Sequence, residues 1–150
     1  MNSYKLIEDY KSEPVNKHLY KIDGIWVWPM QNNQIFNLFE SLFGNNKIER
    51  IIEIGTAYGG LPILLRVMGF TGDLITYNIH NELSNDIESL FKKFSIEQKI
   101  CDAFESQDLI NSITSDGTTL LICDGGDKPK EVNFFSKHLK INDIIFEFDE

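Results

Sequence analysis

One short segment, residues 50–60, constrains the fold of this chain more than any other. A β-branched apolar run interrupted by Glu53 leads into a turn of small residues that includes Gly55 and Gly59. Such a run is typical of a buried parallel strand. A helical pattern follows, with Pro62 in the first turn, where the missing N–H of proline costs nothing. A strand, a small-residue turn and a helix bring backbone N–H groups close to a ligand, so the segment predicts a nucleotide-type binding site.

Length and charge bound the class of protein. The 150 residues predict a single domain, 1–150, with an N-terminal extension at residues 1–23. The net charge of −9 disfavours nucleic acid and anionic membrane partners, because their phosphates would be repelled. No apolar stretch approaches the roughly 20 residues of a spanning helix, and the N-terminus lacks the apolar core of a signal peptide. We therefore expect a cytoplasmic protein.

The cysteines and histidines show no metal-ligand spacing. Cys101 and Cys123 each lie in an apolar, strand-like segment without a C-x-x-C pattern. The histidines are scattered along the chain. Buried, reduced thiols are the expectation for both cysteines.

Short apolar runs alternate with helical periods along the chain, which is typical of an α/β fold. Strands are expected at residues 50–54, 73–78, 97–101, 118–123 and 143–148. A helix is expected ahead of the first strand, and further helices between the strands. The pattern predicts a Rossmann-like, doubly wound sheet of about five parallel strands with flanking helices. Ligands of such sheets bind outside the carboxyl ends of the strands, near the point where the strand order reverses.

The pattern E-x-G-x-x-x-G at residues 53–59 resembles the first motif of class I S-adenosylmethionine-dependent methyltransferases. The resemblance implies that Glu53 faces the methionine ammonium of the cofactor. It also implies that the turn passes beneath the ribose and the carboxylate, a turn formed by Gly55, Thr56, Ala57, Tyr58 and Gly59.

Two other interpretations of this turn remain open. An ordinary strand-to-helix turn would need no ligand. A dinucleotide fingerprint would place Ala57 at its middle glycine, which makes a nicotinamide-dependent oxidoreductase the third candidate function. Glu53 disfavours that reading, since dinucleotide folds usually keep an apolar residue there.

The ends of the second and third expected strands carry further candidates. Asn78 stands where methyltransferases usually place an acidic residue that holds both ribose hydroxyls; it is equally well explained as a turn residue. By position, Asp102 and Ala103 correspond to the residues that methyltransferases place at the adenine amino group and ring. Asp102 with Glu105 also forms a capping-box-like pattern, so a helix N-cap is an equal alternative.

The segment after the fourth expected strand begins with Asp124. An unpaired carboxylate there would be costly unless a metal, a donor or a substrate satisfies it. Asp127 is a candidate N-cap for the next helix. Lys128 and Lys130 in its first turn oppose the helix dipole, so a further interaction would be needed to hold a lysine there.

This segment resembles the small metal-dependent O-methyltransferases and the cephalosporin-hydroxylase, macrocin and rhamnosyl O-methyltransferase group. The resemblance implies that Asp124, with Asp149 and Glu150 after the fifth strand, binds Mg²⁺, and that Lys128 acts as the catalytic base. In the alternative interpretation, Asp124 caps the glycine turn and Lys128 is solvated. Sheets of this family have seven strands, whereas this sequence stops just after the fifth.

The expected function is therefore methyl transfer from S-adenosylmethionine to a hydroxyl of a small molecule, assisted by Mg²⁺. A domain that binds S-adenosylmethionine without turnover, as part of an assembly, is the alternative. The stop after the fifth strand is expected either from a shortened gene product or fragment, or from a partner or homo-oligomer that covers the open sheet edge.

Overall fold

The computed structural model describes residues 20–29 and 34–148, and these fall into two compact units. The first unit contains the residues up to 47 together with 57–71 and 82–96. The second contains residues 48–56, 72–81 and those from 97 on. The expected single domain stays a prediction, and each unit is described by itself.

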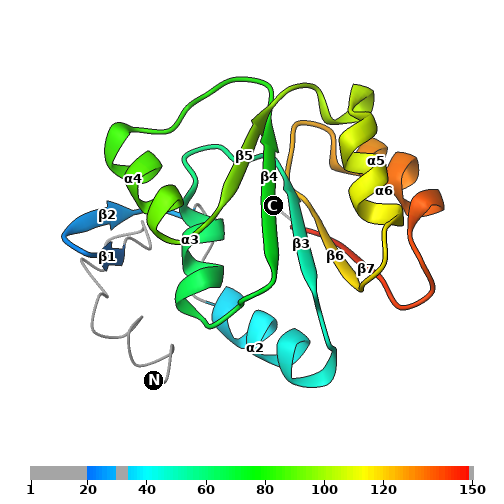
Figure 1. Cartoon of the computed structure of the whole chain (residues 1–150), viewed down its shortest axis with the longest axis horizontal. Coiled ribbons are helices and arrows are strands. Elements are labelled where there is room, and N and C mark those ends of the chain that lie inside the picture. The colour runs from blue at the N-terminus through cyan, green and yellow to red at the C-terminus, as the bar shows by residue number, and fades with distance from the viewer. Residues whose placement is uncertain (1–19, 30–33, 149–150) are drawn as a thin grey trace. The chain divides into compact units, whose positions relative to one another are not determined.

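A five-stranded parallel sheet forms the second unit (Figure 1). Its strands are β3 (Arg50–Ile54), β4 (Asp73–Asn78), β5 (Glu97–Ile100), β6 (Thr119–Cys123) and β7 (Ile144–Glu147). Their spatial order is β5-β4-β3-β6-β7. All strands are parallel, and the order in which the chain adds strands to the sheet switches from one side of β3 to the other at β6. The predicted doubly wound α/β class is confirmed, and each strand agrees with its expected bounds to within one residue.

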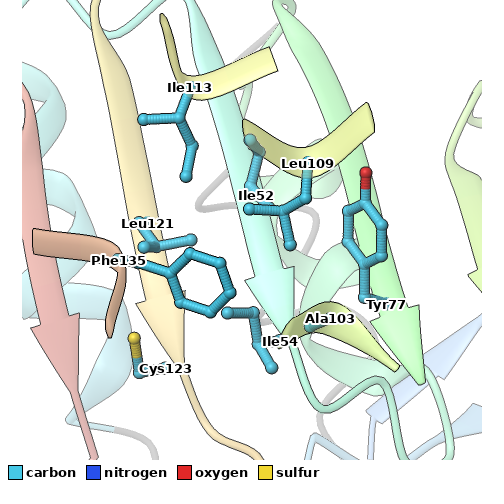
Figure 2. Packing of buried hydrophobic residues seen from close by; sticks show 9 residues of the cluster. All are labelled: Ile52, Ile54, Tyr77, Ala103, Leu109, Ile113, Leu121, Cys123 and Phe135. Atoms are coloured by element: carbon cyan, nitrogen blue, oxygen red, sulfur yellow. The ribbon is translucent and has the colours of Figure 1, made fainter. Parts of the chain in front are cut away.

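Two helices and two short 3-10 turns complete the second unit. They are η1 (Ala103–Glu105), α5 (Gln107–Thr114), α6 (Lys128–Phe135) and η2 (Ser136–His138). Figure 2 shows how Ile52 and Leu121 of the sheet meet Leu109 and Ile113 of α5 and Phe135 of α6. These side chains are almost completely buried, so α5 and α6 are held on the sheet by one continuous apolar cluster.

The described residues of the first unit form a hairpin and three helices. They are β1 (Tyr20–Ile22), β2 (Ile25–Val27), α2 (Ile35–Asn45), α3 (Gly60–Val67) and α4 (Asn85–Lys93). The hairpin was not predicted from the sequence. Asp23 and Gly24 both have positive φ, 52° and 79°, as a type I′ turn requires. An Asp-Gly pair between two short strand-like runs is the sequence signal for such a hairpin.

Arg66 ties the ends of two helices of the first unit together. Its guanidinium donates to the carbonyl oxygens of Phe94 at 2.8 Å, Ser95 at 2.9 Å and Phe70 at 3.1 Å. These carbonyls lie just beyond α3 and α4, where backbone acceptors have no partner within the helix.

In the described residues, no helix is long and apolar enough to cross a bilayer.

We expect Arg66→Lys to lower the free energy of unfolding by about 1–3 kcal/mol, because an ammonium cannot replace three bonds from a planar fork. Urea unfolding followed by circular dichroism measures this difference. Lys93→Gln is the matched control, since it removes an exposed ion pair with Asp23 and should cost less than about 1 kcal/mol. Equal effects of the two substitutions would contradict the role given to Arg66.

Candidate functional site

A pocket of about 310 Å³ opens at the carboxyl ends of β3 to β6, inside the second unit. Its wall includes Gly55 after β3, Asn78 at the end of β4, Asp102 and Ala103 after β5, and Gly125 after β6. The first four are predicted cofactor-binding residues. The structure therefore brings the candidates from three separate strands together at the edge of the sheet where the topology predicts a ligand.

The turn after β3 is held against the turn after β6. Gly55 has a φ of +98°, and a Cβ at this position would lie 2.2 Å from the carbonyl oxygen of Asp124. The Asp124 N–H donates to the carbonyl of Ile54 at 2.9 Å, which fixes the contact from the other side. The positive φ and the lack of space for a Cβ both require glycine at position 55. The close approach of the two turns forms one end of the pocket.

Asn78 and Asp102 both line the pocket and both make local hydrogen bonds. Asn78 donates through Nδ2 to the carbonyl of His80 at 2.8 Å. Asp102 accepts the N–H of Phe104 at 2.9 Å through Oδ1 and is the N-cap of η1, so the capping alternative is confirmed. A cap uses one carboxylate oxygen, and so the role at an adenine amino group stays a prediction.

Glu53 is buried in β3 and is held by hydroxyl groups. Its Oε1 accepts a hydrogen bond from Thr76 Oγ1 at 2.6 Å, and Thr76 Oγ1 lies 2.6 Å from Thr56 Oγ1. Burial raises the pKa of Glu53 to about 8; the bond from Thr76 lowers it, and the charge of Asp124 raises it further. Glu53 is not among the pocket-lining residues, and the Thr56 hydroxyl is engaged with Thr76, so their contacts with a cofactor stay predictions.

Asp124, the predicted metal ligand, and Lys128, the predicted base, form an ion pair at the start of α6. Lys128 Nζ lies 3.5 Å from Asp124 Oδ1, and the two side chains are only 15% and 19% exposed. The alternative in which Lys128 is merely solvated does not hold. Their catalytic roles stay predictions, because the pair by itself stabilises the charged form of the lysine.

Glu131 is a pocket residue that the sequence analysis did not identify. It is 2% exposed, and its Oε1 accepts the Gly125 N–H at 3.1 Å. A Cβ at Gly125 would lie 2.4 Å from Oε2, so the glycine makes room for this carboxylate. Burial raises the pKa of Glu131, and the charge of Asp124 adds to this rise. The hydrogen bond from Gly125 acts in the opposite direction and lowers the pKa. Glu131 lies four residues before Phe135, so the two share the inner face of α6, and this spacing is the sequence signal that could have identified Glu131 as buried.

The remaining predicted cofactor residues, Ala57, Tyr58 and Gly59, belong to the first unit. Gly59 is the N-cap of α3 in the left-handed region, and Ala57 has a φ of 45°. Tyr58 stacks on Trp28, with ring centroids 5.5 Å apart and planes inclined by 14°. Their roles toward a cofactor stay predictions.

The predicted Mg²⁺ ligands Asp149 and Glu150 lie outside the described residues. Within residues 20–29 and 34–148, no group of three or more His, Cys, Asp or Glu side chains could hold a metal ion. Asp124 thus has no set of metal ligands around it in the part of the chain that the structure describes. Cys101 and Cys123 are free thiols and Cys123 is buried; Cys101 is partly exposed.

Comparison with known proteins identifies the fold. No protein-family model matches the chain, and no curated protein matches its sequence. Among solved structures it is similar to a protein assigned as a caffeoyl-CoA O-methyltransferase from Staphylococcus aureus, with a TM-score of 0.62 and 15% identity over 79% of this chain and 58% of that one. The fold is that of the class I methyltransferases.

Two further structures share this methyltransferase fold. An apo structure of CmcI has a TM-score of 0.63 at 13% identity, covering 87% of this chain and 57% of its own. The O-methyltransferase TomG of Streptomyces achromogenes, solved with S-adenosylmethionine, has a TM-score of 0.55 at 19% identity, covering 78% and 56%. The chain therefore spans less than two-thirds of each of these structures, and identities this low establish the fold alone.

The buried carboxyl of Glu53 should make stability depend on pH. The pKa of Glu53 is about 8 in the folded protein, against the ordinary value of 4.5 for a glutamate, so the folded protein holds one more proton than the unfolded chain between these pH values. Stability should therefore fall as pH rises from 5.5 to 8, by about 1 kcal/mol per pH unit from this group.

Glu53→Gln keeps an acceptor for Thr76 but cannot titrate, so its free energy of unfolding should change less over this range. Urea unfolding at several pH values measures the slope, and the exposed Glu105→Gln is the control. An unchanged slope in Glu53→Gln would show that this carboxyl is already ionised in the folded protein.

Proposed function

We propose that this chain binds S-adenosylmethionine in the pocket of the second unit and transfers its methyl group to a hydroxyl of a small molecule. The observation that carries the proposal is the convergence of Gly55, Asn78, Asp102 and Ala103 on one pocket at the strand-order reversal of a methyltransferase fold. The pocket volume of about 310 Å³ is at the lower end of the range for small-molecule sites, roughly 300–1,000 Å³.

The chemistry of the wall suits an adenosyl group. Asn78 and Asp102 offer hydrogen-bonding groups for ribose hydroxyls and an exocyclic amine. Ala103 and Phe104 offer apolar surface for a purine ring. Asn78 is the last residue of β4, and the other three residues follow β5, which are the positions at which the methyltransferase resemblance places these roles.

The charge of the wall favours a cationic ligand over a dinucleotide. Apart from the buried Glu131, whose pKa is raised by burial, the pocket-lining residues include two acidic side chains, Asp102 and Asp127, against a single cationic side chain, Lys130. A sulfonium cofactor is attracted by this balance, whereas the pyrophosphate of a nicotinamide dinucleotide is repelled. The charge therefore supports S-adenosylmethionine rather than NAD as the ligand.

The proposed reaction is an in-line displacement at the sulfonium methyl carbon. The acceptor oxygen forms a bond to the methyl carbon as the carbon–sulfur bond breaks, and the acceptor proton passes to Lys128. Lys128 must be neutral to accept it, so Asp124 has to be engaged by another group at that moment. In the metal-assisted form of the proposal, Mg²⁺ held by Asp124, Asp149 and Glu150 would lower the pKa of the acceptor hydroxyl.

A second function is binding of the cofactor without turnover, within a homo-oligomer or a larger assembly. The Lys128–Asp124 ion pair favours this alternative, since it keeps the proposed base charged. The chain also spans only 56% to 58% of the O-methyltransferase-fold structures described above. For either function we propose the cytoplasm as the location and a small molecule as the partner.

Thermal unfolding tests the binding step. S-adenosylhomocysteine at 100 times its Kd should stabilise the protein by about 2.7 kcal/mol, whereas NAD at the same concentration should leave the melting temperature unchanged. Stabilisation by NAD and none by S-adenosylhomocysteine would assign the pocket to a dinucleotide and overturn the proposal.

Turnover separates catalysis from binding alone. We expect methyl transfer to a member of a catechol and sugar panel, and Lys128→Met should lower kcat by about 10² to 10⁴, as the loss of a general base does. The exposed Lys92→Met serves as the control and should retain full activity. Rates that do not change with EDTA would remove Mg²⁺ from the scheme, and a fully active Lys128→Met would remove Lys128 as the base.

A further inference from the structure

Lys130 occupies a position that the helix itself disfavours. It lies in the first turn of α6, where the positive end of the helix dipole repels a cation. Its backbone N–H is taken by the Asp127 cap at 3.1 Å, but its ammonium forms no ion pair with the described residues. The electrostatics of the helix therefore give no reason for a lysine here.

The ammonium of Lys130 lies over the ring of Phe104, with Nζ 4.3 Å from the ring centroid. Both residues line the pocket, and Lys130 is the one cation among the described lining residues. Since the Lys130 side chain is exposed, it can move over the ring without disturbing the core.

Phe104 itself is fixed in place. Its ring stacks on Phe135 at 5.6 Å with the planes inclined by 13°, and it meets the edge of Phe134 at 5.2 Å. Its backbone N–H is held by Asp102 at 2.9 Å. Phe104 is thus in contact with two polar side chains: Lys130, a donor that can move, and Asp102, an acceptor that is held in place.

We propose that Lys130 is a specificity-determining residue that reads the purine of the bound ligand by donating to a ring nitrogen beside the exocyclic amine. This inference rests on the proposed binding of an adenosyl compound. When adenine stacks on Phe104, the ammonium moves from the ring to the edge of the base, while Asp102 accepts from the amine. Adenine places an amine donor next to ring-nitrogen acceptors, which matches this pair, whereas a base with a carbonyl in place of the amine would face the Asp102 carboxylate.

Calorimetry with base-modified ligands tests this assignment. S-adenosylhomocysteine is compared with its 1-deaza and 7-deaza analogues, each of which lacks one ring nitrogen beside the amine. The protein should bind one of the two about tenfold more weakly, the size expected for loss of a charge-assisted hydrogen bond. In Lys130→Met, affinity for S-adenosylhomocysteine should fall about tenfold, and the discrimination against that analogue should disappear.

Two matched variants accompany the test. Lys137→Met removes a lysine whose Nζ lies 5.1 Å from the ring centroid of Phe134 and which does not line the pocket, so it should bind all three ligands as the unmodified chain does. Lys130→Arg keeps a donor and should keep the discrimination. Thermal unfolding of Lys130→Met confirms that the variant is folded, which is expected at an exposed position.

The outcomes separate this inference from the proposed function. If the unmodified chain binds S-adenosylhomocysteine and Lys130→Met binds it equally well, or still discriminates between the analogues, Lys130 does not read the base while the pocket remains an adenosyl site. If the unmodified chain binds none of the three ligands, the proposed function fails and the role of Lys130 fails with it.

Discussion

The contact between the turns after β3 and β6 is the constraint on which the rest of the site depends. Because the Asp124 carbonyl occupies the space that a Cβ at Gly55 would need, the two turns can approach only with glycine at this position. The approach occurs where the strand order reverses, which is where a doubly wound sheet leaves room for a ligand. The pocket lies beside this contact, since Gly55 and Gly125 both line it.

Buried carboxyl groups are the second feature that organises the site. Glu53 is satisfied by a threonine hydroxyl, and Glu131 by the backbone of Gly125. Among the described residues, neither carboxyl forms an ion pair with a cation, and burial raises the pKa of both. Carboxyls held in this way cost free energy, which supports a function at this edge of the sheet rather than a purely structural role.

The sequence was sufficient to predict the sheet but not every part of the site. Strands such as Arg50–Ile54 and Thr119–Cys123 are short apolar runs bounded by turn residues, and that pattern depends on local sequence alone. The N-caps at Asp102 and Asp127 were likewise predictable, since a cap is a local interaction. The Asp-Gly turn between β1 and β2 carried a local signal too, but the runs beside it are only three residues long.

Glu131 and Lys130 could not be assigned to the pocket from the sequence, because their positions depend on tertiary contacts. Glu131 faces Gly125 only once α6 is docked on the sheet by Phe135. The aromatic partner of Lys130 is Phe104, which lies more than twenty residues earlier in the chain. Charge and spacing along the helix do not reveal either contact.

The proposed function requires that the pocket between Gly55 and Phe104 binds an adenosyl group. A crystal structure of the chain soaked with S-adenosylhomocysteine tests it most directly. We expect electron density for the purine over Phe104 and for the ribose beside Asn78 and Gly55. An empty pocket at a saturating ligand concentration, or density for the ligand elsewhere on the molecule, would contradict it.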